Sequence, residues 1–361
     1  KAKPVNDEMR RDFVGGRGFD LWLLWHSTQS ATQWDSPENE IVIASGPCGG
    51  TTQYPGSGKS IAAAISPLTN IPIDSNAGGH FGPYLKFAGW DALEVQGNAP
   101  QDVIVYINAP AGTVQVLEAP ASCPTNTHVL GHWLNENLAQ NEQDRQLMAF
   151  VTAGVGSEHT LMGCLNFSLY DRKRRDLRYK QAGRGGIGTV LRHKRVKALV
   201  VRTLPFGGDA NHPADLNRIA ETGAEMHREV ARWDPVQNRM RSRGTSYLVQ
   251  IMDDYDLLPV KNFQYGSHPE TPKINGDIWE KRFTPNMPDG CWFGCTVACA
   301  HAVDNYKLQT GPYAGSCVIV DGPEYETIAG VGSNCGIFEP AAILEMNFYC
   351  DTYGIDTISF G

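Results

Sequence analysis

Apolar residues gather in short runs along the first two hundred positions, and glycine or proline separates one run from the next. Short apolar runs between turn residues predict β-strands. Such runs cover residues 40–45, 92–95, 102–107, 113–117 and 198–202. Residues 108–112 read Asn-Ala-Pro-Ala-Gly and predict a hairpin loop between the third strand and the fourth.

The apolar spacing becomes helical after a Pro/Gly-rich loop at residues 204–208. One face then collects Leu216, Ile219, Ala220, Gly223, Met226 and Val230, with Pro213 just before it, which predicts a helix. A second helix is predicted over residues 340–353, where Ala341, Leu344 and Phe348 form one stripe and Gly354 follows as a stop. We therefore expect an α+β fold, with a β-rich domain at residues 1–205 and a mainly helical domain at residues 206–361.

The composition narrows the class of protein. Of the 361 residues, 41% are hydrophobic and 19% are charged, which is typical of a globular and not a disordered chain. A net charge of −8 argues against a general nucleic-acid binder. The apolar stretches are too short to cross a bilayer, and no basic start with an apolar core predicts a signal peptide. A soluble cytoplasmic protein is therefore expected.

Basic residues are concentrated in one segment. Between Arg172 and Lys197 the chain has eleven Lys or Arg and one acidic residue, Asp176. A solvated loop is the usual meaning of such a charge run. This one, however, encloses residues 182–188, which read Ala-Gly-Arg-Gly-Gly-Ile-Gly. Glycine lets a backbone approach a ligand and arginine pairs with phosphate through two hydrogen bonds, so the segment also predicts a site for a phosphate-bearing ligand.

Three further glycine-rich loops occur at residues 14–18, 56–60 and 76–79. The loop at 56–60 resembles the end of a P-loop, but Gln53 stands five residues before Gly58, where that motif requires glycine. A single loop of this kind is most often a turn. Because three of the four loops also contain Lys or Arg, together they favour one large polar or multiply phosphorylated ligand.

Three of the nine cysteines are regularly spaced. Cys291, Cys295 and Cys299 are separated by three residues each, and thiolates at such spacing can hold an iron–sulfur cluster whose fourth ligand comes from elsewhere. Structural zinc, with His301 as a fourth ligand, is the alternative. Radical enzymes that use S-adenosylmethionine have unequal gaps between their cysteines, so the equal gaps count against that class. Buried, unreactive thiols are the remaining interpretation.

An acidic motif follows the cysteines. Residues 321–326 read Asp-Gly-Pro-Glu-Tyr-Glu. Carboxylates after a Gly-Pro turn are an ordinary helix start, because they favour the positive end of the helix dipole. The functional alternative is a carboxylate that accepts a proton or a hydrogen bond beside a reaction centre. The residues alone leave both interpretations open.

Taken together, these segments resemble the aldehyde:ferredoxin oxidoreductase family, which comprises tungsten or molybdenum enzymes with a bis-pterin cofactor. The similar stretches occur in the family's order along almost the whole chain, at residues 15–18, 66–69, 75–79, 81–83 with 85–89, 182–186, 322–326 and 354–359. The resemblance implies a first domain of two β-sheets beneath the pterins, followed by a helical domain. Family chains continue well past Gly361, so we expect the helical domain to be incomplete in this chain.

The resemblance also assigns candidate site residues. Pterin phosphates would be bound by Lys59 and Arg184. The cofactor would be lined by residues of the glycine-rich loops, namely Asn76, Ala77, Gly78, Gly79, Gly185 and Gly186, and Asp356 would hydrogen-bond a pterin ring. Glu326 would sit beside the metal and help to activate water or substrate. Cys291, Cys295 and Cys299 would hold a 4Fe–4S cluster.

The activity that the resemblance implies is two-electron oxidation of an aldehyde to a carboxylic acid. Electrons would leave through the cluster to ferredoxin or a ferredoxin-like subunit, and a homo- or hetero-oligomer is expected. The alternatives are a ring-reducing subunit of the benzoyl-CoA reductase kind and a non-catalytic iron–sulfur or pterin-binding protein. Glu326 favours aldehyde oxidation because it completes the Gly-Pro-Glu-Tyr-Glu motif of the aldehyde-oxidising members.

Two departures from the family pattern are visible. The usual cluster motif has one residue fewer between its first two cysteines than this chain has between Cys291 and Cys295. In addition, Lys59 stands where an arginine is common, which keeps the charge and loses the two parallel hydrogen bonds of a guanidinium.

Overall fold

The computed structural model describes residues 1–207, 209–287 and 289–361, which form two compact units. The first unit consists of Lys1–Thr52, Ser57–Leu216 and Thr352–Ile355, and the second consists of Gln53–Gly56, Asn217–Asp351 and Asp356–Gly361. Each unit therefore includes one short segment that is distant in sequence. Gly208, part of the expected boundary loop, lies outside the described residues, and a boundary between residues 205 and 206 stays a prediction.

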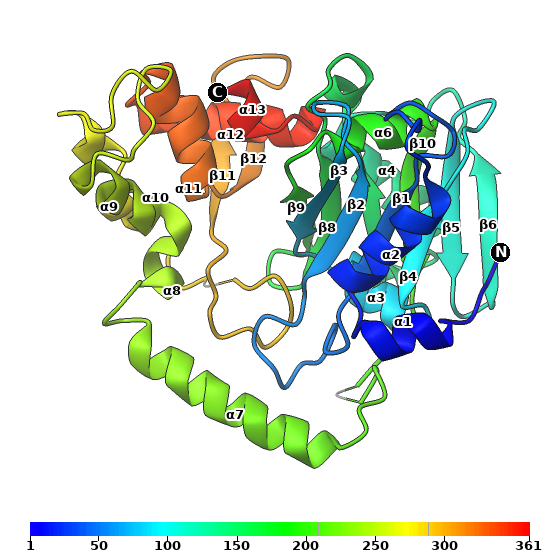
Figure 1. Ribbon diagram of the computed structural model, residues 1–361. Helices are drawn as coiled ribbons and strands as arrows, with labels where there is room; N and C mark the ends of the chain where they lie inside the picture. The colour runs from blue at the N-terminus through cyan, green and yellow to red at the C-terminus, as the bar shows by residue number, and fades with distance from the viewer. Residues whose placement is uncertain (208, 288) are drawn as a thin grey trace. The chain divides into compact units, whose positions relative to one another are not determined.

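Two β-sheets form the first unit (Figure 1). The antiparallel four-stranded sheet has the order β3-β2-β1-β4 and consists of β1 (Ile41–Ser45), β2 (Ser60–Ile65), β3 (Pro72–Ala77) and β4 (Ala92–Val95). The six-stranded sheet has the order β6-β5-β10-β7-β8-β9 and consists of β5 (Val103–Asn108), β6 (Thr113–Glu118), β7 (Met148–Thr152), β8 (Leu165–Asp171), β9 (Asp176–Ala182) and β10 (Val196–Arg202). Strand β10 pairs in parallel with β5, and the other neighbours pair antiparallel.

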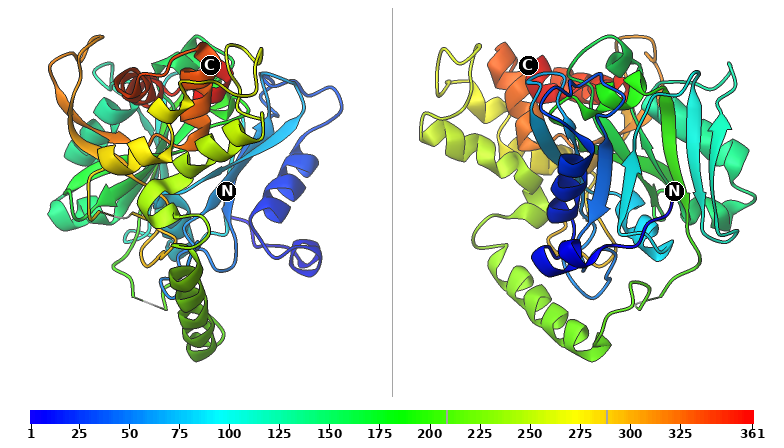
Figure 2. Two further views of the ribbon diagram at one scale, coloured as in Figure 1. Left: turned by 90° about the vertical axis from the view of Figure 1, so that its left-hand side faces the viewer. Right: turned by 45° about the vertical axis from the view of Figure 1, so that its right-hand side comes forward.

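Helices cover and separate these sheets. They are α1 (Asp7–Asp12), α2 (Arg17–Ser27), α3 (Phe81–Phe87), α4 (Thr127–Leu138), α5 (Glu142–Gln146) and α6 (Ile187–His193), with a 3-10 turn η1 (Val155–Glu158). Helix α2 packs on β1 and β2, whereas α3 and α6 contact strands of both sheets (Figures 1 and 2). Helix α4 buries Leu130 and Leu134 against the six-stranded sheet.

The centre of the six-stranded sheet is buried on both faces. Every residue of β7 and β8 is buried, and Phe150 and Phe167 are fully inaccessible. Strands covered on both sides read as continuous and not alternating patterns. This is why residues 148–152 carry no period-two signal that separates them from a buried helix. Strand β8 is the exception, since Leu165, Phe167 and Leu169 alternate with the polar Asn166 and Ser168.

The second unit is mainly helical. Its helices are α7 (Leu216–Trp233), α8 (Met240–Arg243), α9 (Leu248–Asp254), α10 (Gly276–Arg282), α11 (Tyr325–Thr327), α12 (Pro340–Tyr353) and α13 (Thr357–Phe360). Short turns are η2 (Gly244–Tyr247), η3 (Thr271–Lys273), a π-helical turn η4 (Ile328–Gly332) and η5 (Ser333–Cys335). A two-stranded sheet joins β11 (Ala302–Lys307) to β12 (Cys317–Asp321). Its core gathers around Trp279, Ile328 and Ile343, all fully buried.

The predicted α+β class, with a two-sheet part followed by a more helical part, is confirmed. The five predicted strands correspond to β1, β4, β5, β6 and β10, and the two predicted helices to α7 and α12. Strands β2, β3, β7, β8 and β9 and the helices of the first unit were not predicted. Strand β2 is rich in alanine and β3 carries Asp74, Ser75 and Asn76, so neither shows the β-branched alternation typical of a strand.

No helix in the three described ranges combines the length and the apolar character that a membrane crossing would require.

A close approach of backbone to backbone within the first unit gives a test of this fold. A Cβ on Gly154 would lie 2.1 Å from the carbonyl carbon of Tyr353, whereas a Cβ on Gly46 would meet no described atom within 4 Å. We expect Gly154→Ala to lower the free energy of unfolding by about 1–3 kcal/mol or more, because main-chain atoms cannot move aside as a flexible side chain can. Urea unfolding of both variants measures this. Equal midpoints for Gly154→Ala and the control Gly46→Ala would contradict the packing described.

Candidate functional site

Two of the predicted glycine-rich loops are brought together by the pairing of β2 with β3. The register places Ser60 opposite Ala77 and Ile61 opposite Asn76. Lys59, directly before β2, therefore lies beside the chain that leaves β3 at residues 78–79. The side chains of Lys59 and Asn76 are exposed, whereas Ala77, Gly78 and Gly79 are buried. Because alternate residues of a strand share a face, Lys59 is expected on the same face as Asn76.

The loop that contains Arg184 reaches the same strand. It connects β9 to α6, and the backbone N–H of Arg184 donates a hydrogen bond to the Ser75 hydroxyl at 3.3 Å. The Arg184 side chain is exposed, Gly185 is half-buried and Gly186 is buried. The first unit thus places Lys59 and residues 76–79 at the end of β3, and the Arg184 loop along the same strand at Ser75 and Ile73.

The glycines of these loops have two different explanations. Gly79 and Gly186 have φ angles of +90° and +71°. A Cβ would lie 2.9 Å from the Phe167 carbonyl oxygen in the first case and 2.2 Å from the Leu161 carbonyl oxygen in the second. The protein's own packing therefore requires glycine at both positions. At Gly183 a Cβ would meet no described atom within 4 Å, so here the backbone is open to a ligand.

The basic segment is a solvated loop only in part: Arg172, Lys173 and Arg175 are exposed in the turn between β8 and β9, whereas other cations of the segment are buried. Arg178 is 2% exposed and its guanidinium lies 3.2 Å from the Asp171 carboxylate. Arg174 contacts the same carboxylate at 2.6 Å, and Lys194 is fully buried. These cations serve the packing of β8, β9 and α6. Arg184 differs because its side chain is exposed, which leaves it available to an anion.

The three cysteines lie in an irregular loop of the second unit, between α10 and β11, and all three are partly buried. The Sγ atom of Cys295 accepts a hydrogen bond from the backbone N–H of Gly56 at 3.3 Å. Gly56 comes from the short segment Gln53–Gly56, which belongs to the same unit. The two ends of the glycine-rich loop at 56–60 therefore have different neighbours. Gly56 contacts the Cys295 thiol, and Lys59 lies directly before β2.

Hydrogen bonds hold the Cys295 thiol in its ionised form. A hydrogen bond with Cys291 and the backbone N–H groups of Gly56, Ala298 and Val297 lower its pKa to about 5, against burial, which raises it. A thiol with a lowered pKa is a thiolate at neutral pH, and the thiolate is the form that binds metals. The donor chemistry at Cys295 thus fits a soft metal centre.

The structure brings together two of the three predicted cluster ligands, Cys291 and Cys295. In the described part of the chain, no group of three or more His, Cys, Asp or Glu side chains is arranged to hold a metal ion. The role of Cys299 as a third ligand stays a prediction. His301, the candidate fourth zinc ligand, has its Nε2 atom 3.1 Å from the Met240 carbonyl oxygen and its ring stacked on Phe283 at 4.6 Å, and these contacts disfavour a zinc site.

The acidic motif combines a helix start with one exposed carboxylate. Glu324 accepts a hydrogen bond from the Thr245 hydroxyl, and the Thr245 oxygen accepts one from the Tyr325 N–H at 2.9 Å. Glu324 therefore supports the beginning of α11. Glu326, one residue inside that helix, has an exposed side chain. Of the two glutamates, Glu326 is the one that faces solvent.

Asp356 has a structural role that the sequence analysis missed. It is 4% exposed and is the N-cap of α13. Its carboxylate accepts hydrogen bonds from the Ile358 N–H at 3.0 Å, the Ser359 N–H at 3.2 Å and the Ser359 hydroxyl at 2.6 Å. An Asp directly before a helix is a known capping signal, so the sequence could have predicted this capping role. Contact with a pterin ring stays a prediction.

Three functional neighbours were also missed. Ser75 anchors the Arg184 loop, Gly56 contacts Cys295, and Thr245 holds Glu324. Each acts across at least 79 residues of sequence, and no local motif marks such a pairing.

Two family models match this chain. The model described as "Aldehyde ferredoxin oxidoreductase, N-terminal domain" matches residues 1–203. The model described as "Aldehyde ferredoxin oxidoreductase, domains 2 & 3" matches residues 221–361.

Curated relatives match along the whole chain. A "Tungsten-containing aldehyde ferredoxin oxidoreductase" of Pyrococcus horikoshii is 32% identical over 367 residues, covering 100% of this chain and 54% of the relative. An "Aliphatic sulfonate oxidoreductase, WOR-like subunit" of Pyrococcus furiosus is 26% identical over 375 residues, covering 100% of this chain and 55% of the relative. The chain therefore spans about half the length of the curated relatives it matches.

A solved structure shares the fold. It is described as "Active site complex BamBC of Benzoyl Coenzyme A reductase in complex with 1,5 Dienoyl-CoA" and matches with a TM-score of 0.73 at 18% identity. The match covers 98% of this chain and 51% of that chain. At this identity the likeness shows the arrangement of sheets and helices and nothing of the chemistry.

The capping role of Asp356 can be tested by substitution. Asp356→Ala removes the acceptors at the start of α13 and should lower the free energy of unfolding by about 0.5–2 kcal/mol, whereas Asp356→Asn keeps a capping oxygen and should cost less. Thermal and urea unfolding of both variants measure this. If the two variants were equally stable, the capping role would be refuted.

Proposed function

The chain belongs to the aldehyde ferredoxin oxidoreductase family, and we propose that it takes part in the oxidation of an aldehyde to a carboxylic acid at a tungsten or molybdenum bis-pterin centre. The observation that carries this proposal is the placement of Lys59, residues 76–79 and the Arg184 loop along one strand, β3, with Lys59 beside its end and the Arg184 N–H on Ser75. Two exposed cations and an open glycine backbone suit an anionic, phosphate-bearing cofactor.

Each residue of this surface has a chemical task in the proposal. Lys59 would attract a pterin phosphate as a point charge, and Arg184 would bind one through two parallel N–H groups. The exposed amide of Asn76 offers both donors and an acceptor to the edge of a ring. Gly183 lets the ligand come close to the backbone next to Arg184. The bound group would supply the two-electron chemistry, and the protein would orient it.

We further propose that Cys291, Cys295 and Cys299 hold a 4Fe–4S cluster that carries electrons away from the centre. The support is the contact between the first two thiols and the N–H of Gly56 aimed at the Cys295 sulfur at 3.3 Å. Hydrogen bonds to cluster sulfurs raise the reduction potential of the cluster. The acceptor would be ferredoxin or a ferredoxin-like subunit.

Glu326 is the proposed proton acceptor. Its carboxylate is exposed and Glu324, two residues earlier, is tied to Thr245. An exposed carboxylate can take a proton from water or substrate, whereas one oxygen of Glu324 already accepts the Thr245 hydroxyl at the start of α11. Ring reduction is the second candidate and ranks lower because Glu326 completes the motif of the aldehyde oxidisers.

The cluster assignment is tested by removing one thiol. In the full-length protein, Cys295→Ala should abolish most of the visible iron–sulfur absorbance and lower the bound iron, because one of the ligands is lost. Cys317→Ala is the control, since this exposed cysteine lies at the start of β12. Spectra and iron content that are the same in both variants would exclude Cys295 as a ligand.

The role of Glu326 is tested by an isosteric change. Glu326→Gln removes the proton-accepting oxygen and should lower turnover of an aldehyde about 100-fold or more, with metal content intact. The control Glu324→Gln keeps an acceptor for the Thr245 hydroxyl and should change turnover little. Steady-state rates with an artificial electron acceptor measure both. Full activity of Glu326→Gln would remove Glu326 from the mechanism.

A further inference from the structure

A cavity of about 920 Å³ lies in the first unit, outside the surface assigned to the pterin. The proposed pterin surface and this cavity lie at opposite ends of helix α6. It begins after Gly186, at the end of the Arg184 loop, and its last residues, Arg192 and His193, line the cavity. A volume near 900 Å³ is in the range of sites for small organic ligands.

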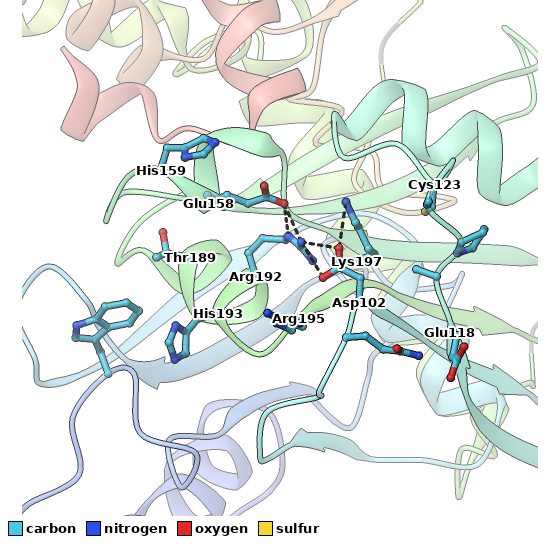
Figure 3. Close-up of a pocket in the computed structure, with 16 residues that line it drawn as sticks. Asp102, Glu118, Cys123, Glu158, His159, Thr189, Arg192, His193, Arg195 and Lys197 are labelled. Carbon is cyan, nitrogen blue, oxygen red and sulfur yellow. Dashed lines mark hydrogen bonds and ion pairs between the residues drawn. The ribbon is translucent and has the colours of Figure 1, made fainter.

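Two buried cations form one wall of this cavity. Arg192 is 8% exposed and Lys197 is 7% exposed. Figure 3 shows Arg192 between the carboxylates of Glu158 and Asp102, with Lys197 beside Asp102. The guanidinium lies 2.7 Å from Glu158 and 3.1 Å from Asp102, and the Lys197 ammonium lies 3.5 Å from Asp102. Two positive charges thus balance two negative charges.

The ion pairs leave one donor of this wall unused. Nη1 of Arg192 is buried, and no acceptor among the described residues contacts it. A buried guanidinium N–H without an acceptor is costly, and natural structures rarely retain one without a ligand or ordered water. A purely structural ion network accounts for Nε and Nη2 and leaves Nη1 and the cavity beside it unexplained.

The backbone also aims a cation at the cavity. The parallel pairing of β10 with β5 places Val196 opposite Val103 and Ala198 opposite Ile104, so Lys197 is the extra residue of a β-bulge. Bulges redirect a side chain and occur often beside functional sites. The remaining charged or titratable groups that line the cavity are Arg195, His159, His193, Glu118 and Cys123. Burial raises the pKa of the Cys123 thiol, so the net charge of the lining is positive or neutral.

We propose that this cavity binds a small organic anion whose acidic group contacts Arg192 and Arg195. Its apolar part would pack against Trp34 and Pro120, which also line the cavity. Carboxylate and phosphate monoester share the required chemistry, since the oxygens of either can accept a hydrogen bond from Nη1 of Arg192 and pair with the charge of Arg195. The site is independent of the proposed redox function, because none of its residues belongs to the pterin or cluster sets.

Calorimetric titration of the full-length protein tests this proposal with three probes of similar ring size. Benzoate and phenyl phosphate carry the anionic group, and benzyl alcohol is the uncharged control. We expect saturable binding of at least one anion and none of the alcohol. Binding of benzoate alone or of phenyl phosphate alone would support the site and identify the acid it prefers.

Two variants locate the binding. Arg195→Gln removes an exposed cation without touching the ion pairs, and Arg192→Lys keeps the charge and removes the Nη1 donor, so each should weaken binding about tenfold or more. Arg11→Gln, an exposed position on α1, should leave it unchanged. Failure of both anions to bind would overturn the proposal. So would affinity that is the same in Arg195→Gln as in Arg11→Gln, because that result would place the anion elsewhere, for example at the redox centre.

Discussion

The antiparallel pairing of β2 with β3 is the constraint on which the candidate cofactor surface depends. It sets Lys59 beside the chain that leaves β3, and Ser75 of the same strand anchors the Arg184 loop. Side chains of a strand alternate between faces, so a slip of one residue would bury Asn76 and expose Ala77. The alternation of buried Ser75, exposed Asn76 and buried Ala77 ties β3 to this register.

Burial divides the basic segment into two kinds of cation. A buried charge is stable only when it is paired, because the free-energy cost of removing it from water is larger than the stabilisation that packing alone provides. Arg178 meets this condition through Asp171, and Arg192 meets it through Asp102 and Glu158. Arg184 does not need an ion-pair partner within the protein, since its side chain is exposed to water. The same stretch of sequence therefore supports β9 and α6 and also offers a cation to a ligand.

The fold class and the outer elements were predictable because their signals are local. Strand β4 is a short apolar run between turn residues, and helix α7 has one clear apolar face. Strand β7 was missed because both its faces are buried, which removes the alternation. Strand β8 alternates Leu165, Phe167 and Leu169 with Asn166 and Ser168 and was overlooked. Strand β3 was missed because Asp74, Ser75 and Asn76 make it polar.

The candidate site was predictable in its residue types and not in its contacts. Glycine, lysine, arginine and cysteine at set positions carry chemical meaning in the sequence. The hydrogen bond from Gly56 to Cys295 spans 239 residues, and the one from Arg184 to Ser75 spans 109. Contacts at such separation depend on how strands pair and loops close, which no local pattern encodes.

Elemental and pterin analysis of the native protein, together with its intact mass, tests most directly whether it holds a bis-pterin metal centre and a 4Fe–4S cluster. We predict tungsten or molybdenum at about one per chain, a pterin, and about four irons. Iron without tungsten, molybdenum or pterin would contradict the redox centre and leave an iron–sulfur protein. Zinc as the sole metal would contradict the cluster as well.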